Sequence, residues 1–280
     1  MTYDLKNKVV LITGSTGGLG QAAAEALRAR GARLALLDLQ LEDVKAQAAK
    51  LGGADVAYAC EANVCSMGSL EAAMRSVEQH FGAIDVVIAG AGIGFTEPME
   101  TMESRTFERT IDVNLNGVWR TFKAGLPYVS KRQGYMLAVS SMAAFVNAPL
   151  NAHYAASKAG VLAMCNSLRL EFKHLGVGVG TLHPTFFKTP MMDALMGNPC
   201  SELVFNNYQG IWKFVELETV VKGLVEGIAS RREMITVPNS NALVARAPGL
   251  LRGLIERLGF NDQRVAEAVR VSSAAKNRDE

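Results

Sequence analysis

Short apolar runs alternate with helical patterns along most of this sequence, and this alternation limits the possible folds more than any other feature. Runs rich in Val, Ile, Leu and Ala predict strands at 8–13, 32–38, 55–60, 84–90, 134–141, 176–184 and 233–238. Helices are expected between them at 21–30, 42–51, 67–81, 103–129, 152–175 and 218–231. The pattern predicts an α/β fold with a doubly wound, Rossmann-type, mostly parallel seven-stranded sheet that carries helices on both faces.

The alternation of predicted strands and helices ends after Pro238. No linker or repeat interrupts it before that residue. We therefore expect one domain over residues 1–240. Residues 241–280 are expected to add an amphipathic segment and a polar tail whose end frays, but not an independent domain. The formal net charge of +2 and the lack of a basic block give no reason to expect nucleic acid as a partner.

The cysteines and the length of the apolar runs indicate in which cellular compartment the protein is expected. Cys60, Cys65, Cys165 and Cys200 match no metal-binding spacing, so we expect reduced thiols and no metal. The first residues lack the pattern of a signal peptide, and no apolar run reaches the roughly 18 residues of a membrane span. These observations favour a cytoplasmic location.

The stretch TGSTGGLG, Thr13 to Gly20, lies between the first predicted strand and the first predicted helix. Gly14, Gly18 and Gly20 would provide a tight turn, close backbone approach and close helix packing, which a pyrophosphate at a helix N-terminus needs. Glycine clusters often serve packing alone. Here Asp38 follows roughly 20 residues later at the end of the second strand, and this context predicts a dinucleotide site.

Asp38 also indicates which dinucleotide is bound. Its carboxylate could accept both hydroxyls of the adenosine ribose, whereas a 2′-phosphate would meet a like charge that Leu39 cannot offset, so NAD is favoured over NADP. A solvated aspartate at a strand end is the alternative interpretation. The cofactor-binding residues predicted in this half of the chain are Gly14, Ser15, Gly18, Leu19, Gly20, Asp38, Leu39, Asn63 and Val64.

Tyr154 and Lys158 lie four residues apart in an alanine-rich stretch, so they share one face of a predicted helix. A cation about 4 Å from the phenol, at an effective dielectric near 20, favours the phenolate by roughly 4 kcal/mol, or about three pKa units. Burial opposes part of this effect. We expect the pKa of Tyr154 to approach neutrality, where it would suit a general acid or base. The alternative is an interfacial aromatic residue.

Taken in order, these motifs resemble the short-chain dehydrogenase/reductase family over about residues 7–192. The matching elements are T-G-x-x-x-G-x-G at 13–20, Asn114 in DVNLNG, Ser141, Y-x-x-x-K at 154–158, and PTFFKT at 184–189, which resembles the family's P-G-x-x-x-T loop. The resemblance implies that 1–240 is a dinucleotide-binding catalytic domain. It also implies hydride transfer between NAD and a secondary alcohol or ketone.

The same resemblance assigns roles to individual residues. Tyr154 would exchange a proton with the substrate oxygen, and Ser141 would hydrogen-bond that oxygen. Lys158 would tune Tyr154 and hold the nicotinamide ribose, and Asn114 would hold a water that relays protons. Further cofactor contacts are implied at Ala91, Gly92, Tyr154, Lys158, Pro184 and Thr189, the last at the nicotinamide carboxamide.

Alternatives stay open for several of these residues. Ser140 could replace Ser141 as the catalytic serine, Ser141 could merely cap a strand end, and Asn114 could be a buried amide that only satisfies backbone groups. His153 and His183 are expected to be structural. Departures from the family pattern are AGAG at 89–92 in place of N-N-A-G, Thr185 in place of glycine, and Asn63 in place of aspartate.

Apolar residues that follow the strand ends are candidates for the substrate pocket, unless they belong to the core. They are Phe95, Met142, Phe145, Val146, Pro149, Phe186, Phe187, Met191 and Met192. Such a lining predicts a hydrophobic, alicyclic or steroid-like alcohol or ketone. The competing functions are an NADPH-dependent ketone or 3-oxoacyl reductase on the same fold, and a non-catalytic NAD-binding regulatory module.

Two surfaces suggest partners. The family resemblance implies a homodimer or homotetramer that pairs long helices between subunits, where Ala155, Ala156 and Ala159 would permit close approach. In the C-terminal segment, Leu250, Leu251, Leu254, Ile255 and Leu258 share one helical face. That face is expected to pack on the domain or on a partner subunit; a lid over the substrate, or contact of 249–260 with a membrane surface, are alternatives.

Overall fold

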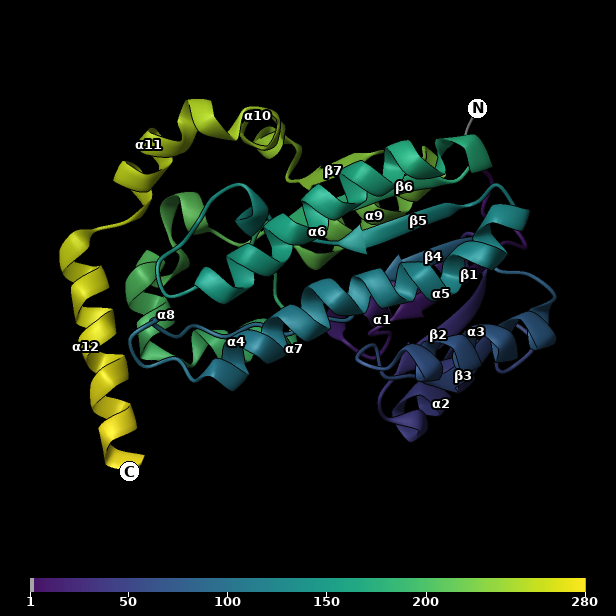
Figure 1. Cartoon of the computed structure of the whole chain (residues 1–280), viewed down its shortest axis with the longest axis horizontal. Coiled ribbons are helices and arrows are strands. Elements are labelled where there is room, and N and C mark those ends of the chain that lie inside the picture. Colours follow the sequence, from purple (N-terminus) through teal and green to yellow (C-terminus); the bar gives the residue numbers. More distant parts are fainter. Residues whose placement is uncertain (1–2, 280) are drawn as a thin grey trace.

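The computed structural model describes residues 3–279 and builds them around one parallel sheet (Figure 1). Its strand order is β3-β2-β1-β4-β5-β6-β7. The strands are β1 Val9–Thr13, β2 Arg33–Asp38, β3 Ala57–Glu61, β4 Val86–Ala89, β5 Tyr135–Val139, β6 Gly178–Pro184 and β7 Met234–Val237. The predicted doubly wound fold is confirmed, and each strand lies within a few residues of its predicted place.

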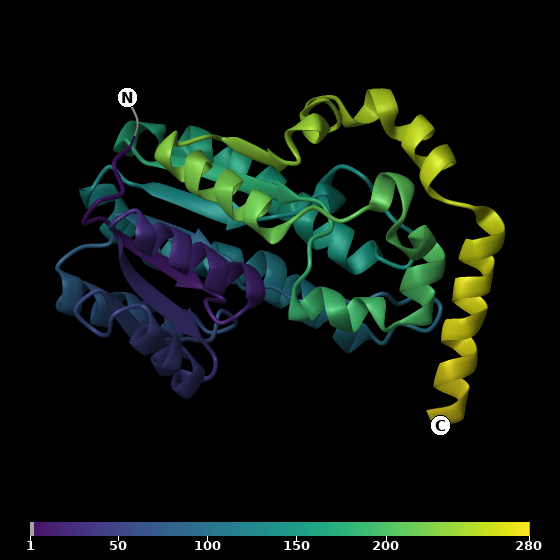
Figure 2. The same cartoon turned by 180° about the vertical axis from the view of Figure 1, so that it is seen from behind.

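Helices cover both faces of the sheet. One face carries α1 (Gly18–Ala29), α2 (Leu41–Lys50) and α9 (Leu217–Ala229), which are in front in Figure 2. The other face carries α3 (Met67–Phe81), α5 (Gly117–Lys131) and α6 (Ala152–Glu171). Successive side chains of a strand point to opposite faces. Val9 and Leu11 of β1 accordingly pack under α3 and α5, while Val10 and Ile12 pack under α1.

The long helix predicted over 103–129 is interrupted in the structure. It consists of α4 (Ser104–Ile111), a π-helical turn at Asp112–Asn116, and α5. The extra residue of such a turn rotates one side chain away from the ordinary helical face, and π-turns are frequent at functional sites. Here the turn carries Asn114, which is fully buried.

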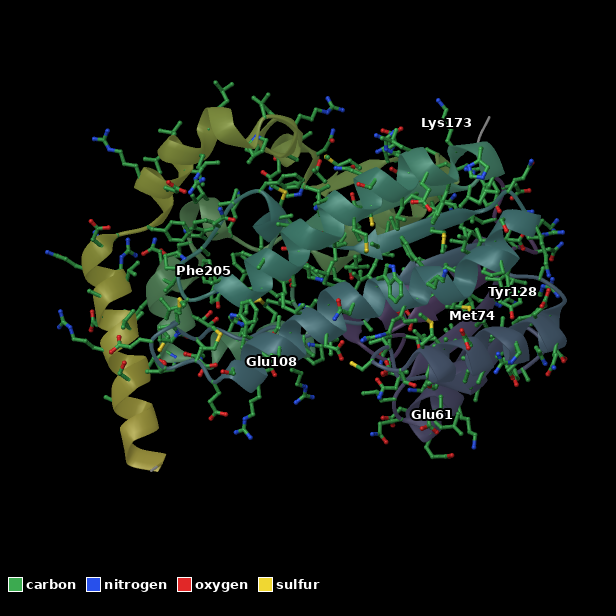
Figure 3. The ribbon with its side chains drawn as sticks, viewed as in Figure 1. Glu61, Met74, Glu108, Tyr128, Lys173 and Phe205 are labelled. Carbon is green, nitrogen blue, oxygen red and sulfur yellow. The ribbon has the colours of Figure 1, made fainter. Side chains whose placement is uncertain are left out.

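The segment between β6 and α9 forms a small helical layer, which the alternation of strands and helices in the sequence did not predict. It contains α7 (Pro190–Met196), α8 (Pro199–Val204) and two 3-10 turns. Aromatic side chains hold this layer together at ring-centroid distances between 4.9 and 6.3 Å around Phe186, which contacts Phe205, Tyr208, Trp212 and Phe214. Figure 3 labels Phe205 beside α8.

Three helices follow β7: α10 (Ala242–Arg246), α11 (Pro248–Gly259) and α12 (Asp262–Asp279). In both ribbon views α12 runs beside α8 at the edge of the molecule (Figures 1 and 2). The expected frayed end belongs to the helix α12, which runs to Asp279. In the first half of this helix Val265, Ala268 and Val269 recur at helical spacing and pack into the apolar cluster around α8. Among the described residues, no helix is long and apolar enough to cross a membrane.

Candidate active site

The predicted site residues meet at the carboxyl edge of the sheet. Gly14 follows β1, Asp38 ends β2, Asn63 follows β3, and Ser141 follows β5. The strand order places β2 and β4 on the two sides of β1. An open α/β sheet forms its ligand crevice at this point, where the winding direction reverses.

The glycine turn is packed closely enough that side chains would not fit. Gly14 has φ +72°, and a Cβ there would lie 2.7 Å from Cα of Ala91. A Cβ on Gly20 would overlap the carbonyl oxygen of Gly14. A Cβ on Gly18, the first residue of α1, would lie 3.0 Å from Cγ2 of Thr189. The glycine turn, the loop after β4 and the loop after β6 therefore meet at the N-terminus of α1.

The loop after β6 is held at both ends. The backbone N–H of Thr185 donates to the carbonyl of Val237 at 2.9 Å, so the threonine that replaces the family's glycine extends the pairing of β6 with β7 beyond Pro184. Thr189 caps α7, its hydroxyl accepting a 3.2 Å hydrogen bond from the backbone of Met192. This cap fixes Thr189 against the glycine turn.

Asp38 is held by Thr16, a residue that the sequence analysis did not select. The backbone N–H and the hydroxyl of Thr16 donate to Oδ2 of Asp38 at 3.0 and 2.6 Å, and the N–H of Leu39 donates to Oδ1 at 2.8 Å. The side chain of Leu39 is exposed and brings no charge. The position of Thr16 within the glycine turn was the available signal.

The remaining predicted contacts of the adenosine side have structural partners. Ser15 is fully buried, and its carbonyl accepts from Nε2 of Gln47 at 2.8 Å, so Gln47 of α2 helps to fix the turn. Asn63 accepts the backbone N–H of Cys65 at 2.9 Å, and Val64 packs on Gly117 at the start of α5. Leu19, in the first turn of α1, is half-buried and packs against the core on that face of the sheet.

Tyr154 and Lys158 lie one turn apart on α6, as predicted. Nζ of Lys158 is 5.5 Å from the centroid of the Tyr154 ring and donates to the carbonyl of Val139 at 2.9 Å. The loop after β4 passes across both side chains. A Cβ on Gly92 would lie 3.6 Å from Nζ of Lys158, and one on Gly94 would lie 3.6 Å from the Tyr154 ring.

The expected lowering of the tyrosine pKa is not found. Burial raises the pKa of Tyr154 above its ordinary value of 10, and the side chain of Ser141 opposes this shift. Burial also lowers the pKa of Lys158 to about 8. The expectation was wrong because it let the charge of Lys158 outweigh burial, whereas burial is the larger effect on this phenol. The amine faces the ring and the carbonyl of Val139.

The two candidate serines have different surroundings. The hydroxyl of Ser140 is buried and donates to the backbone carbonyl of Lys158 at 3.1 Å, which fixes α6 to the sheet. Oγ of Ser141 accepts the backbone N–H of Ala143 at 3.1 Å. This bond uses one lone pair of Oγ and leaves the hydroxyl proton to donate, and the side chain of Ser141 is within hydrogen-bond reach of Tyr154, whose pKa it lowers. Ser141 therefore fits the catalytic serine better than Ser140.

Asn114 connects the π-helical turn with the loop after β4. Its Oδ1 accepts from the N–H of Ile93 and its Nδ2 donates to the Ile93 carbonyl, both at 2.8 Å. Nδ2 also lies 3.2 Å from Oγ of Ser157. A Cβ on Gly92 would lie 3.3 Å from Oδ1. Asn114 and Lys158 therefore lie on either side of Gly92. The Asn114 amide also satisfies the backbone N–H and carbonyl of Ile93.

The glycine that replaces an asparagine of the family pattern has a geometric reason. A Cβ on Gly90 would lie 2.8 Å from the backbone oxygen of Thr13. Oγ1 of Thr13 accepts the N–H of Gly90 at 3.2 Å. In this chain the loop after β4 is thus fixed to the end of β1 by a threonine side chain and a close backbone approach.

Some of the predicted pocket residues belong to the core, whereas others are partly exposed. Met142 and Phe145 are buried against Ala245 of α10, Phe186 belongs to the aromatic layer, and Met192 is buried near α8. Half-buried positions are found for Val146, Pro149 and Phe187.

Residues near Tyr154 remain accessible. Phe95, next to Gly94, is 38% exposed and Met191 at the start of α7 is 43% exposed, so both can contact a substrate. Leu195 was missed by the sequence analysis, yet its Cδ1 would be 3.9 Å from a Cβ on Gly94, next to the Tyr154 ring. No motif marks Leu195, because it lies on the unpredicted helix α7. His153 is fully buried, with its ring 6.3 Å from that of Phe95.

Known proteins resemble the chain over this region. The family model for short chain dehydrogenases matches residues 8–198. D-threitol dehydrogenase of Mycolicibacterium smegmatis is 34% identical over 193 residues, which cover 68% of this chain and 74% of the relative. A 3-oxoacyl-[acyl-carrier-protein] reductase of Vibrio cholerae is 33% identical over 193 residues, covering 69% and 78%.

A solved structure shares the fold. A short chain dehydrogenase/reductase from Burkholderia phymatum in complex with NAD superposes with a TM-score of 0.78 at 20% identity, over 89% of this chain and 97% of that one. The match to the family model includes the glycine turn, Ser141 and the pair Tyr154 and Lys158. The chain belongs to the short-chain dehydrogenase family, whose members are oxidoreductases that bind a nicotinamide cofactor and act on an alcohol or a ketone.

Proposed function

We propose that this protein is an NAD-dependent dehydrogenase that interconverts a hydrophobic secondary alcohol and its ketone. The observation that carries the proposal is the meeting of Ser141, Tyr154 and Lys158 at the edge of the sheet where Asp38 and the glycine turn also lie. Glycines 92 and 94 pass over Lys158 and Tyr154. The residues fit the cofactor. Glycines 14, 18, 20 and 92 occupy positions where the backbone must be free of side chains.

Each part of the crevice has a separate task. The glycine turn and the N-terminus of α1 would hold the pyrophosphate, Asp38 the adenosine ribose, and Lys158 the nicotinamide ribose. When bound, NAD supplies the hydride acceptor. The protein moves the proton. Tyr154 takes it from the alcohol oxygen, and Ser141 donates a hydrogen bond to that oxygen, whose negative charge grows during the reaction.

Lys158 supports Tyr154 through its charge. Burial holds the phenol in its protonated form, so the phenolate needs a cation nearby. Lys158 is that cation while it remains protonated, which burial restricts to pH values below about 8. Asn114 keeps the loop after β4 in place over both side chains. We propose that it also orders the water through which protons leave.

The preference for NAD over NADP follows from the charge at the end of β2. Thr16 and the backbone of Leu39 hold the Asp38 carboxylate at the mouth of the crevice, and neither side chain adds a cation. A 2′-phosphate would therefore meet a fixed negative charge. Titration with NADH and NADPH, followed by cofactor fluorescence, tests this directly. A tenfold or greater preference for NADPH would contradict it and favour the reductase function.

The test of catalysis is a panel of secondary alcohols with NAD, followed by absorbance of the reduced cofactor. The panel includes alicyclic alcohols and threitol. A 3-oxoacyl thioester with NADH or NADPH tests ketone reduction, the reaction named for the Vibrio cholerae relative. In Tyr154→Phe we expect turnover to fall at least about a hundredfold while NADH binding persists. Unchanged turnover would refute the role of Tyr154, and no turnover in the wild type with intact NADH binding would favour a regulatory module.

We also propose a homo-oligomer. Exposed aromatic and apolar side chains lie on the helices that cover one face of the sheet, namely Phe107 of α4, Trp119 of α5 and Leu170 of α6. Ala156 of α6 is also exposed, and its small side chain would allow a second helix to approach closely. Light scattering of the wild type and of Trp119→Glu tests the proposal. We expect the variant to be smaller than the wild type, and a monomeric wild type would contradict it.

A further inference from the structure

His183 is a buried imidazole that the proposed mechanism does not use. It lies on β6 directly before Pro184 and has no exposed surface. Its Nδ1 is 3.1 Å from the backbone oxygen of Ser141, and its Nε2 is 2.8 Å from Oγ1 of Thr181. The ring of Phe145 packs on it at a centroid distance of 4.7 Å. Each polar atom of the ring therefore has one partner.

These partners define the tautomer. A backbone oxygen can only accept, so Nδ1 of His183 must carry the proton. Nε2 is then an acceptor, and the hydroxyl of Thr181 donates to it. The same hydroxyl lies 3.3 Å from the carbonyl of Glu233, a longer contact than the one to the ring. Burial lowers the pKa of His183 to about 4, with the charge of Lys158 acting in the same direction and the Ser141 carbonyl opposing.

The contact occurs where the backbone ladder ends. The N–H of Ser140 donates to the carbonyl of Leu182 at 2.8 Å. This backbone hydrogen bond joins the end of β5 to β6 directly before Ser141. Ser141 itself has extended dihedral angles, and the chain turns into the 3-10 turn Met142–Ala144 immediately after it. Its carbonyl accepts from His183 on one side and from the N–H of Ala144 on the other.

We propose that His183, held by Thr181, is a positioning residue that fixes the backbone of Ser141 so that its hydroxyl faces Tyr154. The inference rests on the proposed function, in which Ser141 binds the reacting oxygen. The imidazole extends the pairing of β5 and β6 by one further hydrogen bond from a side chain. A small displacement of Ser141 would misalign its hydroxyl, and misplacement near the chemistry by about 1 Å can cost roughly a hundredfold in rate.

The hydrogen bonds can be tested without any substrate. Long-range ¹H–¹⁵N NMR of the histidine rings, with His183 assigned by its absence in a variant, reports which nitrogen carries the proton. We expect a neutral ring protonated on Nδ1 throughout the neutral range. In Thr181→Val the Ser141 carbonyl still requires the proton on Nδ1, so we expect the tautomer to persist while the ¹⁵N resonance of Nε2 shifts for lack of its donor; Thr181→Ser should keep the wild-type resonance. A ring protonated on Nε2, or one that titrates near the ordinary value of about 6.5, would overturn the proposal.

Turnover then tests whether the contact matters for catalysis. His183→Asn keeps an N–H close to the position of Nδ1, and His183→Leu removes it. With the best alcohol of the panel we expect kcat to fall about tenfold in His183→Leu and about twofold in His183→Asn, with KM for NAD unchanged. His174 is the matched control. Its Nδ1 also meets a carbonyl, that of Glu171 at 2.7 Å, but on the surface, so His174→Leu should retain full activity.

The outcomes separate this inference from the proposed function. Equal losses in the Asn and Leu variants, or an unchanged kcat in a folded His183→Leu, would overturn the positioning role. If His183→Leu does not fold, Thr181→Val against Thr181→Ser gives the same comparison. Should Ser141→Ala retain the full rate, the proposed function fails, and the positioning role fails with it even where NMR confirms the hydrogen bonds. Should the panel give no turnover, the NMR result alone decides whether His183 holds Ser141.

Discussion

At the scale of single residues, the position of one proton governs the chemistry. Alcohol oxidation needs Tyr154 as the phenolate, but burial raises the pKa of this group. At neutral pH the phenolate is therefore scarce, and its population grows as the pH rises. We expect the rate of oxidation to climb from about pH 6 to about pH 8 and then to stop rising, because Lys158 loses its proton and with it the charge that supports the phenolate. Ketone reduction, which needs the neutral phenol, should stay constant between about pH 6 and 8. Initial rates in both directions test this, and an oxidation rate independent of pH would contradict it.

A second residue, Gly90, replaces an asparagine of the family pattern. A Cβ at this position would approach the backbone oxygen of Thr13 to 2.8 Å, and backbone atoms cannot move aside cheaply. We expect Gly90→Ala to lower the free energy of unfolding by about 1–3 kcal/mol and to weaken NADH binding, because the neighbouring Ala91 packs on Gly14. Denaturant unfolding and fluorescence titration measure the two effects.

The control for Gly90 is a glycine with free space around it. A Cβ on Gly253 of α11 would have no neighbour within 4 Å, so Gly253→Ala should not lower the stability. Equal effects of the two substitutions would mean that the loop after β4 adapts to a side chain. The family's asparagine would then be compatible with this backbone as well.

At the scale of elements, the packing of α12 against α8 can be tested at a single buried side chain. Ala268 has no exposed surface and faces the apolar cluster that includes Cys200 and Val204 of α8. Ala268→Glu would place a carboxylate among these groups without a partner. We expect the helix to detach, with a loss of about 2 kcal/mol or more in stability and new proteolytic cleavage after α11.

Ala266, two residues earlier on α12, provides the matched control because it is exposed. Ala266→Glu should leave both the unfolding curve and the digestion pattern unchanged. If Ala268→Glu behaves in the same way, α12 contributes nothing to the stability of the fold. Its packing against α8 would then be incidental.

The sequence predicted those elements whose pattern is local. Buried parallel strands are continuous apolar runs, so β1 to β7 could be located, and the motif residues Tyr154, Lys158 and Ser141 came with them. The π-helical turn was missed because no local pattern marks it; its buried residue Asn114 bonds to Ile93, which lies outside the helix. The direction of the Tyr154 shift was missed because it depends on burial and on where Nζ of Lys158 points, and spacing reveals neither.

At the scale of the whole molecule, the two ends of the sheet have separate tasks. The carboxyl end carries the crevice, while the amino end is held by Asp85, which precedes β4. Its carboxylate is 2% exposed and accepts from Nζ of Lys8 at 3.2 Å, from Nε of Arg132 at 3.1 Å and from the N–H of Val9 at 3.0 Å. These contacts join the N-terminal segment, the first strand and the end of α5.

Asp85→Asn should therefore change stability and leave catalysis intact. The amide keeps the shape but loses the charge that two cations face, and breaking a buried charged network costs about 2–4 kcal/mol. Glu78→Gln is the control, since Glu78 meets Lys131 at 3.3 Å on the surface, where such pairs contribute little. Unfolding in denaturant measures the loss, and kcat below the transition should equal that of the wild type. A fall in kcat in the folded Asp85→Asn protein would show that the two ends are coupled, because the strands between them would have transmitted the change to Ser141 and Tyr154.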